Sequence, residues 1–113
     1  MEVDYRSLSE DNLEDALSAC TPEEMLSDPF FGEGLSVRKE WLLNRYRAVG
    51  PCCKIAYVKS VPVGMVQFNP LHRIPYFVTE RRDALYIHCI FVKKVFREKG
   101  IGFRLLQSLI DEM

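Results

Sequence analysis

Hydrophobic and polar residues alternate with a period of two over the opening residues, which is the pattern of a half-buried β-strand, and two later hydrophobic stretches have the composition of extended segments. These patterns predict strands over residues 2–8, 53–58 and 61–68. The last two flank the pair Lys59-Ser60 at the spacing of a β-hairpin, although this pair lacks the glycine that is common in such turns.

A fourth stretch, residues 85–92, is apolar at nearly every position. Such a run is typical of a central strand that is covered on both faces. Strict alternation along it places His88 on one face together with Ile90 and Val92. Cys89 then points to the other face, where we expect a small buried hydrophobe.

The segments between these strands repeat their hydrophobic residues at spacings of three and four, which predicts amphipathic helices. The predicted helices cover about residues 9–20, 21–28, 36–49 and 102–113. Ser9 is expected to cap the first helix, and Asp28-Pro29 to close the second. Trp41 is expected on the inner side of the third helix, and residues 69–84 form a long polar connection.

The composition is that of one globular domain over residues 1–113, with 48% hydrophobic and 27% charged residues. No run approaches the ~20 apolar residues of a membrane span, and the opening residues lack the features of a signal peptide. We therefore expect a cytoplasmic protein that does not bind membranes. The four cysteines have no C-x-x-C spacing and no regular spacing to the histidines, so free thiols and no metal site are expected.

Charge is distributed unevenly along the chain. Residues 1–34 contain ten acidic residues against Arg6 alone, whereas residues 35–113 contain fourteen basic residues against six acidic ones. A basic body attracts polyanions, but no nucleic-acid motif accompanies it, so no nucleic-acid partner is expected. A phosphorylated small molecule suits this charge at least as well.

The stretch with most chemical content is a strand, a basic turn with two glycines, and a helix, within residues 86–110. Gly100 and Gly102 are expected to take positive φ and to let a ligand approach the backbone. The N–H groups at the start of the helix then face a phosphate. The alternative is that these glycines only form a turn before a core helix. The turn carries a basic charge from Lys93, Lys94, Arg97 and Lys99 against Glu98.

Residues 92–102, Val-Lys-Lys-Val-Phe-Arg-Glu-Lys-Gly-Ile-Gly, resemble the acyl-CoA-binding motif of the GNAT superfamily of N-acetyltransferases. The core of that motif is Arg/Gln-x-x-Gly-x-Gly/Ala after a strand that ends in valine or isoleucine. The resemblance implies an α/β (α+β) fold with a mixed, mostly antiparallel sheet flanked by helices. It also implies acetyl-CoA as cosubstrate and an amine as acceptor.

The resemblance further implies which residues bind the cosubstrate. The backbone of Ile90, Phe91 and Val92 would lie along the pantetheine arm, with the main chain of the first and last paired to it like an added strand. The pyrophosphate would lie on backbone N–H groups from Glu98, Lys99, Gly100, Ile101, Gly102 and Phe103. Arg97 and Lys99 would add charge and support.

His88 is the candidate base that deprotonates the acceptor ammonium, directly or through a water. A histidine at the matching position of the serotonin-acetylating member takes part in proton removal, while a core histidine with satisfied nitrogens is the alternative. Tyr86 lies where other members carry a catalytic glutamate, and its phenol is a poor base at neutral pH.

Domains of this family normally continue past the last helix with a further strand and helix. The chain is therefore expected to be a fragment, or to be completed by a homodimer through the exposed edge of residues 85–92. The acidic residues 1–34 border the acceptor site in the family and favour a cationic amine. A non-catalytic acyl-CoA-binding or interaction module is the alternative function.

Overall fold

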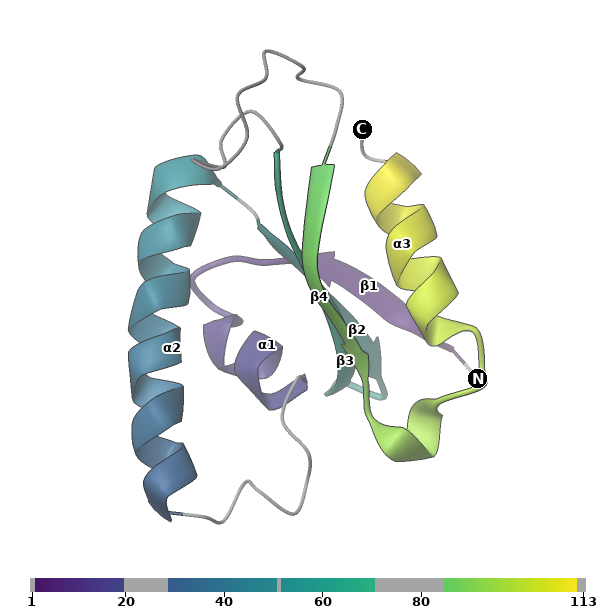
Figure 1. Ribbon diagram of the computed structural model, residues 1–113. Helices are drawn as coiled ribbons and strands as arrows, with labels where there is room; N and C mark the ends of the chain where they lie inside the picture. Colours follow the sequence, from purple (N-terminus) through teal and green to yellow (C-terminus); the bar gives the residue numbers. More distant parts are fainter. Residues whose placement is uncertain (1, 20–28, 51, 71–84, 112–113) are drawn as a thin grey trace.

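The computed structural model describes residues 2–19, 29–50, 52–70 and 85–111. Figure 1 shows a sheet of four strands with helices on both of its faces. Helices α1 (Leu13–Ala19) and α2 (Pro29–Val49) lie on one face, and α3 (Ile101–Asp111) lies on the other. The predicted α/β (α+β) architecture is confirmed.

The four strands are neighbours in chain order, and each pairs antiparallel with the next. They are β1 (Asp4–Ser7), β2 (Cys53–Val58), β3 (Val61–Pro70) and β4 (Leu85–Val92). The predicted strand segments are thus all present. The predicted connection over residues 69–84 begins two residues later, because β3 continues to Pro70; residues 71–84 lie outside the described part of the chain.

The hairpin between β2 and β3 turns on Lys59 and Ser60, whose φ angles are +51° and +66°. Positive φ at both central residues is the geometry of a type I′ turn, which matches the twist of the flanking strands. The hairpin therefore forms as the spacing predicts, with two residues that lack the conformational freedom of glycine.

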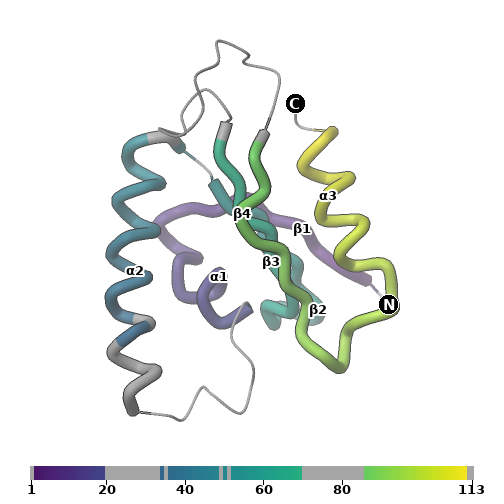
Figure 2. Tube along the Cα trace, viewed as in Figure 1, coloured from purple at the N-terminus to yellow at the C-terminus, as the bar shows by residue number. Residues whose placement is uncertain are grey.

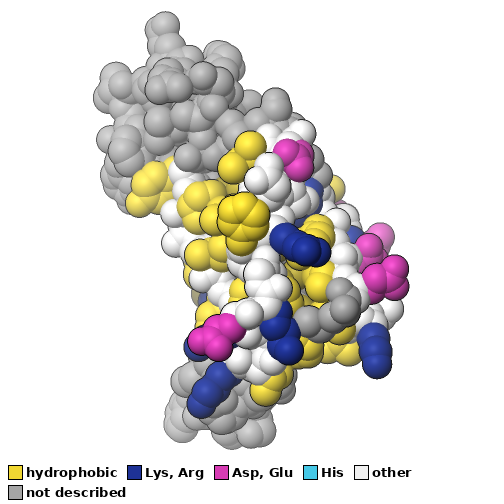
Figure 3. All heavy atoms as spheres, turned by 90° about the vertical axis from the view of Figure 1, so that its right-hand side faces the viewer, with side chains coloured by type: hydrophobic (Ala, Val, Ile, Leu, Met, Phe, Trp, Pro, Cys, Tyr) yellow, Lys and Arg dark blue, Asp and Glu magenta, His cyan; other side chains and the backbone are white. Residues whose placement is uncertain are grey.

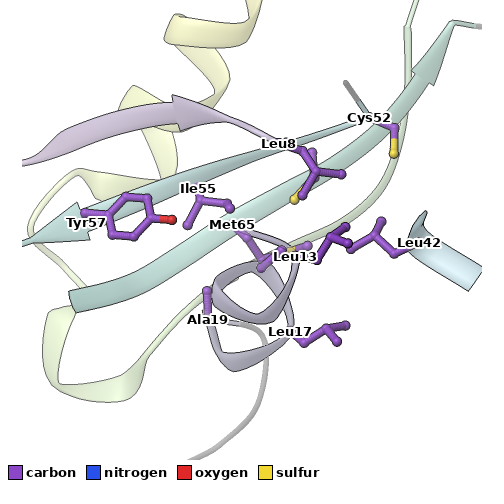
Figure 4. Packing of buried hydrophobic residues seen from close by; sticks show 11 residues of the cluster. Leu8, Leu13, Leu17, Ala19, Leu42, Cys52, Ile55, Tyr57 and Met65 are labelled. Atoms are coloured by element: carbon purple, nitrogen blue, oxygen red, sulfur yellow. The ribbon is translucent and has the colours of Figure 1, made fainter. Parts of the chain in front are cut away.

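One hydrophobic core fills the space between the sheet and α1 (Figure 4). Leu13, Leu17 and Leu42 of the two helices meet Ile55 and Met65 of the sheet. A second core lies under α3 on the opposite face. Its α3 members are Ile101, Leu105 and Leu109, together with Ala56, Val58, Val63, Val66 and Phe68 of the sheet.

Three helix predictions need correction. α1 begins at Leu13 rather than at Ser9, because Asn12 Oδ1 accepts the Ser9 N–H at 2.8 Å and holds a turn ahead of the helix. α2 begins at Pro29 rather than at about Ser36, and the first position of a helix suits proline because its fixed φ is already helical. Trp41 is 50% exposed, and Leu42 takes the inner position. The helix predicted over residues 21–28 lies outside the described residues.

β4 lies at the edge of the sheet, as expected of an exposed edge at residues 85–92, although its apolar run is typical of a central strand. In Figure 2 it runs along the front of the sheet between α2 and α3. Ile87 and Ile90 are 38% and 41% exposed. The apolar run predicts a strand covered on both faces, and the exposure of these two side chains contradicts this prediction. Within the described residues β4 pairs only with β3.

Candidate functional site

The turn between β4 and α3 is held against the sheet at its first residues. The Lys93 N–H donates to the Val63 carbonyl of β3 at 2.8 Å, and a single 3-10 turn follows over Lys94–Phe96. Lys93 itself is only 7% exposed. The exposed charged residues here are Lys94, Arg97, Glu98 and Lys99.

Gly100 forms the entry to α3. Its φ is +78°, and its carbonyl accepts the Arg104 N–H at 3.0 Å, which is the first hydrogen bond of the helix. The N–H groups of residues 101–103 precede that bond and have no carbonyl within the helix to bond to. The positive φ predicted for Gly100 is thus confirmed, and the turn places the first amides of α3 next to basic side chains.

Gly102 differs from the prediction. Among the described glycines only Gly50 and Gly100 have positive φ, and Gly102 is helical. A Cβ added at Gly102 would lie 3.8 Å from Val92 Cγ2 and 3.9 Å from Ile90 Cδ1, which are ordinary contacts. A methyl group would therefore fit at Gly102, so this glycine neither relieves backbone strain nor is required by the packing of α3 on β4.

The second left-handed residue of the turn is Glu98, with φ of +65°. Nothing in the sequence marks it, because glutamate is not a residue that favours this conformation. The turn therefore contains one strained residue that the glycine pattern did not reveal.

Arg97 lies back along β4 instead of extending from the turn. Its Nε donates to the Val92 carbonyl at 2.8 Å, and its guanidinium carbon lies 5.3 Å from the centre of the Phe91 ring. Arg97 thus ties the turn to the strand. Its positive charge is placed at the outer edge of the sheet.

The outer edge of β4 presents the main chain of Ile90 and Val92. Phe91 O faces β3, since a Cβ added at Gly64 would lie 3.0 Å from it. Backbone groups of successive residues in a strand point to alternate sides, so those of Ile90 and Val92 face away from β3. This orientation agrees with the expected pairing to a pantetheine arm. The Val92 carbonyl already accepts one hydrogen bond from Arg97.

A β-bulge at His88 changes which face each residue of β4 occupies. Gln67 pairs with Cys89 whereas Phe68 pairs with Ile87, so His88 is the extra residue. A residue inserted in this way reverses the alternation beyond it. The prediction that His88 shares a face with Ile90 and Val92 is therefore wrong.

His88 lies on the face that carries α1 and α2. Its Nε2 is 2.8 Å from Asn69 Nδ2, and Asn69 Oδ1 in turn accepts a hydrogen bond from Arg45 Nη2 of α2. Ile90 and Val92 instead approach Gly102 of α3. The side chain of His88 thus lies on one face of the sheet, and the side chains of Ile90 and Val92 lie on the other.

Tyr86 contacts His88 edge to face, with ring centroids 4.9 Å apart. Burial lowers the pKa of His88 below its usual 6.5, and the positive charge of Arg45 lowers it further. The imidazole is therefore neutral at pH 7. Sequence reasoning missed Asn69 and Arg45, because the pairing of β3 with β4 brings Asn69 to His88 and the position of α2 brings Arg45 to Asn69.

The cysteines show a different distribution from the predicted one. Cys89 is exposed, whereas Cys52 and Cys53 are both buried, and all three are free thiols. The prediction of a buried Cys89 assumed a central strand. Burial raises the pKa of Cys52.

The acidic residues of the N-terminal segment are partly neutralised by α2. Glu10 pairs with Arg47 at 3.0 Å, and Glu14 pairs with Lys39 at 2.7 Å. Such exposed pairs contribute only about 0–1 kcal/mol to stability. They nevertheless reduce the negative field that the sequence predicted for this segment.

Figure 3 shows the face that carries α3, where hydrophobic and basic side chains lie next to one another. Among the described residues, no three or more His, Cys, Asp or Glu side chains come together as a metal site would require. None of the helices in the described part of the chain is long and apolar enough to cross a bilayer.

Comparison with known proteins gives one consistent result. The model of the Acetyltransferase (GNAT) family matches residues 11–113. No curated protein matches the chain in sequence.

Solved acetyltransferase structures share this fold. An N-acetyltransferase from Staphylococcus aureus Mu50 is 19% identical, with a TM-score of 0.67, over 99% of this chain and 66% of its own. The ribosomal-protein-alanine N-acetyltransferase from Brucella melitensis is 26% identical, with a TM-score of 0.62, over 96% of this chain and 65% of its own.

A third similar structure contains coenzyme A. It is the PaiA N-acetyltransferase from Thermoplasma acidophilum, which is 17% identical, with a TM-score of 0.65, over 99% of this chain and 74% of its own. This chain spans between 34% and 74% of the length of the solved chains.

Proposed function

Because the chain belongs to the GNAT acetyltransferase family, we propose that it binds acetyl-CoA and transfers its acetyl group to a primary amine. The observation that carries this proposal is the turn at Gly100, where a left-handed glycine begins α3 next to exposed basic residues. Free amides at a helix start, with basic side chains beside them, form a site for phosphate groups. The pyrophosphate of CoA is such a group.

In this proposal acetyl-CoA, the acetyl donor, lies along the outer edge of β4. Its pyrophosphate contacts the backbone of residues 98–103, and its pantetheine arm pairs with the main chain of Ile90 and Val92 beside Phe91. Arg97 and Lys99 contribute positive charge. The main-chain orientation of β4 and the coenzyme A complex of the PaiA N-acetyltransferase support this placement.

The reaction begins when a base removes a proton from the acceptor ammonium. The amine nitrogen then attacks the thioester carbonyl, and the carbon–sulfur bond breaks to release CoA as the thiolate, which takes up a proton. His88 is the proposed base, since it is neutral at pH 7 and exposed. Tyr86 packs against the ring of His88 and orients it.

A turnover assay tests the proposal. A panel of polyamines, peptide N-termini and aminoglycosides is incubated with the protein and acetyl-CoA, and released CoA thiol is measured. Acetylation of one class that is lost in His88→Gln, with acetyl-CoA affinity unchanged, supports the assignment. Binding of acetyl-CoA without turnover of any amine indicates a non-catalytic acyl-CoA-binding module instead.

The outer edge of β4 also offers a pairing surface for a second copy of the chain. In the described residues this edge has no partner strand, and an unpaired edge readily adds a strand. Dimer and donor would then compete for the same main-chain groups. Sedimentation should show a dimer that acetyl-CoA dissociates, and a monomer at all concentrations without ligand would exclude this assembly.

A further inference from the structure

Three polar side chains, Arg45, Asn69 and His88, connect α2 to the bulge of β4 and are called the relay below. Arg45 Nη2 donates to Asn69 Oδ1, and Asn69 Nδ2 lies 2.8 Å from His88 Nε2. Asn69 is a polar residue near the end of β3, and it is only 2% exposed. A buried polar side chain is retained at little cost only when its groups are hydrogen-bonded, as both ends of this amide are.

The direction of each hydrogen bond in this relay follows from Arg45. A guanidinium has only donors, so the atom of Asn69 that faces it must be the oxygen. The amide nitrogen then faces His88 and donates, so His88 Nε2 must accept. A neutral imidazole that accepts through Nε2 carries its proton on Nδ1.

We propose that Asn69, oriented by Arg45, is a positioning residue that holds His88 neutral with its proton on Nδ1. This inference rests on the proposed function for its catalytic meaning, because His88 is the base proposed there. The lone pair of His88 Nε2, which would accept the proton from the acceptor ammonium, already accepts the hydrogen bond from Asn69 Nδ2. His88 must therefore leave Asn69 before it acts as a base.

Protonation at Nε2 would place two donors against each other. The Asn69 amide cannot turn over to offer its oxygen, since that oxygen is already used by Arg45. The imidazolium must rotate away, and the exposure of His88 leaves room for this movement. In the part of the chain that the structure describes, the charged or titratable groups that face His88 are Arg45 from α2 and Tyr86 from β4 itself. Cys52 lies near the same Arg45 charge.

Nitrogen NMR of the histidine ring tests the relay without any enzyme activity. The protein carries two histidines, so a His72→Gln background leaves only the ring signals of His88. We expect the Nδ1–H tautomer and a pKa below 6.5. An Nε2–H tautomer in this background would overturn the proposal.

Two substitutions change the hydrogen bond that His88 Nε2 accepts from Asn69. Asn69→Asp places an acceptor opposite Nε2, so His88 should adopt the Nε2–H tautomer with a pKa above that of the parent. Arg45→Met frees the amide to turn over, so the tautomers should mix and the pKa should rise. The matched controls are Asn12→Asp, in a turn near α1, and Arg47→Met, whose parent pairs with Glu10.

The pKa and tautomer should move in the two relay variants and stay unchanged in the two controls. If neither relay variant changes them, the proposal is wrong, and circular dichroism shows which variants are folded. In the turnover assay, Asn69→Asp should move the acidic limb of kcat/KM to higher pH by the same shift that NMR measures. If NMR shows the expected tautomers and pKa changes but no amine is acetylated, the relay is supported and the proposed function is wrong. The NMR and turnover measurements thus distinguish failure of the relay from failure of the proposed function.

Discussion

Replacement of Gly100 by alanine should weaken acetyl-CoA binding far more than it weakens the fold. Gly100 has φ of +78°, and a Cβ added to it meets no atom within 4 Å, so the cost within the protein is the left-handed backbone alone. That cost is about 1–2 kcal/mol for an alanine. For a domain of this size it lowers the Tm by roughly 4–8 °C.

The effect on binding comes from the direction of the new methyl group, which points into the space where the ligand must approach the backbone. Loss of one hydrogen bond to a charged phosphate oxygen costs about 1.5–3 kcal/mol. The Kd for acetyl-CoA should then rise roughly 10- to 100-fold. Isothermal titration calorimetry measures the Kd, and a thermal melt measures the Tm.

Gly50 supplies the matched control for this experiment. It has φ of +83° at the end of α2, and an added Cβ there also meets no atom within 4 Å. Gly50→Ala should lower the Tm by a similar amount and leave the Kd unchanged. If both variants lose the same affinity for acetyl-CoA, the loss comes from reduced stability of the fold. If neither variant loses affinity, Gly100 serves only to form the turn.

Three further predictions concern stability and thiol exposure. The double change of Lys59-Ser60 to Asn-Gly relieves two positive φ angles, so chemical denaturation should show an increase of about 1 kcal/mol in unfolding free energy; a decrease would contradict the type I′ assignment. Gly64→Ala brings a Cβ to 3.0 Å from a carbonyl oxygen of β4, so the strands must separate slightly, and the same measurement should show a loss of about 1–3 kcal/mol. In a Cys20→Ser background, a thiol reagent should label Cys89 in the native protein and Cys52-Cys53 only after unfolding.

The sequence predicted the elements better than it predicted their surroundings. Local patterns located all four strands and the helix after Gly100, because periodicity and turn residues act over a few positions. The apolar run of β4 is typical of a strand covered on both faces, but such a run records hydrophobicity and not what packs against the strand. The exposure of Ile90 and Cys89 follows from the edge position.

The bulge at His88 accounts for the largest error in the site. Alternation assumes a regular ladder, and one extra residue moves Tyr86 and His88 to the face opposite the predicted one. No local signal announces the bulge, because it depends on how β3 and β4 align. Asn69 and Arg45 are distant from His88 in the sequence, and only the folded chain brings them together, so no local pattern could reveal them as its partners.

The charge of Arg45 should set the pH dependence of the reaction as well as the orientation of Asn69. A positive charge beside His88 disfavours the imidazolium, and it equally disfavours an acceptor ammonium bound there. Arg45→Met removes both effects, so both groups release their protons at higher pH. The acidic limb of kcat/KM should therefore move to higher pH.

Arg45→Lys separates charge from geometry in this argument. A lysine keeps the positive charge but lacks the fixed fork of the guanidinium. If charge dominates, the lysine variant keeps the pH profile of the parent while the methionine variant shifts. If the orientation of Asn69 dominates, both variants shift alike. A profile that neither substitution moves would remove Arg45 from the site, and His88 would then titrate independently of α2.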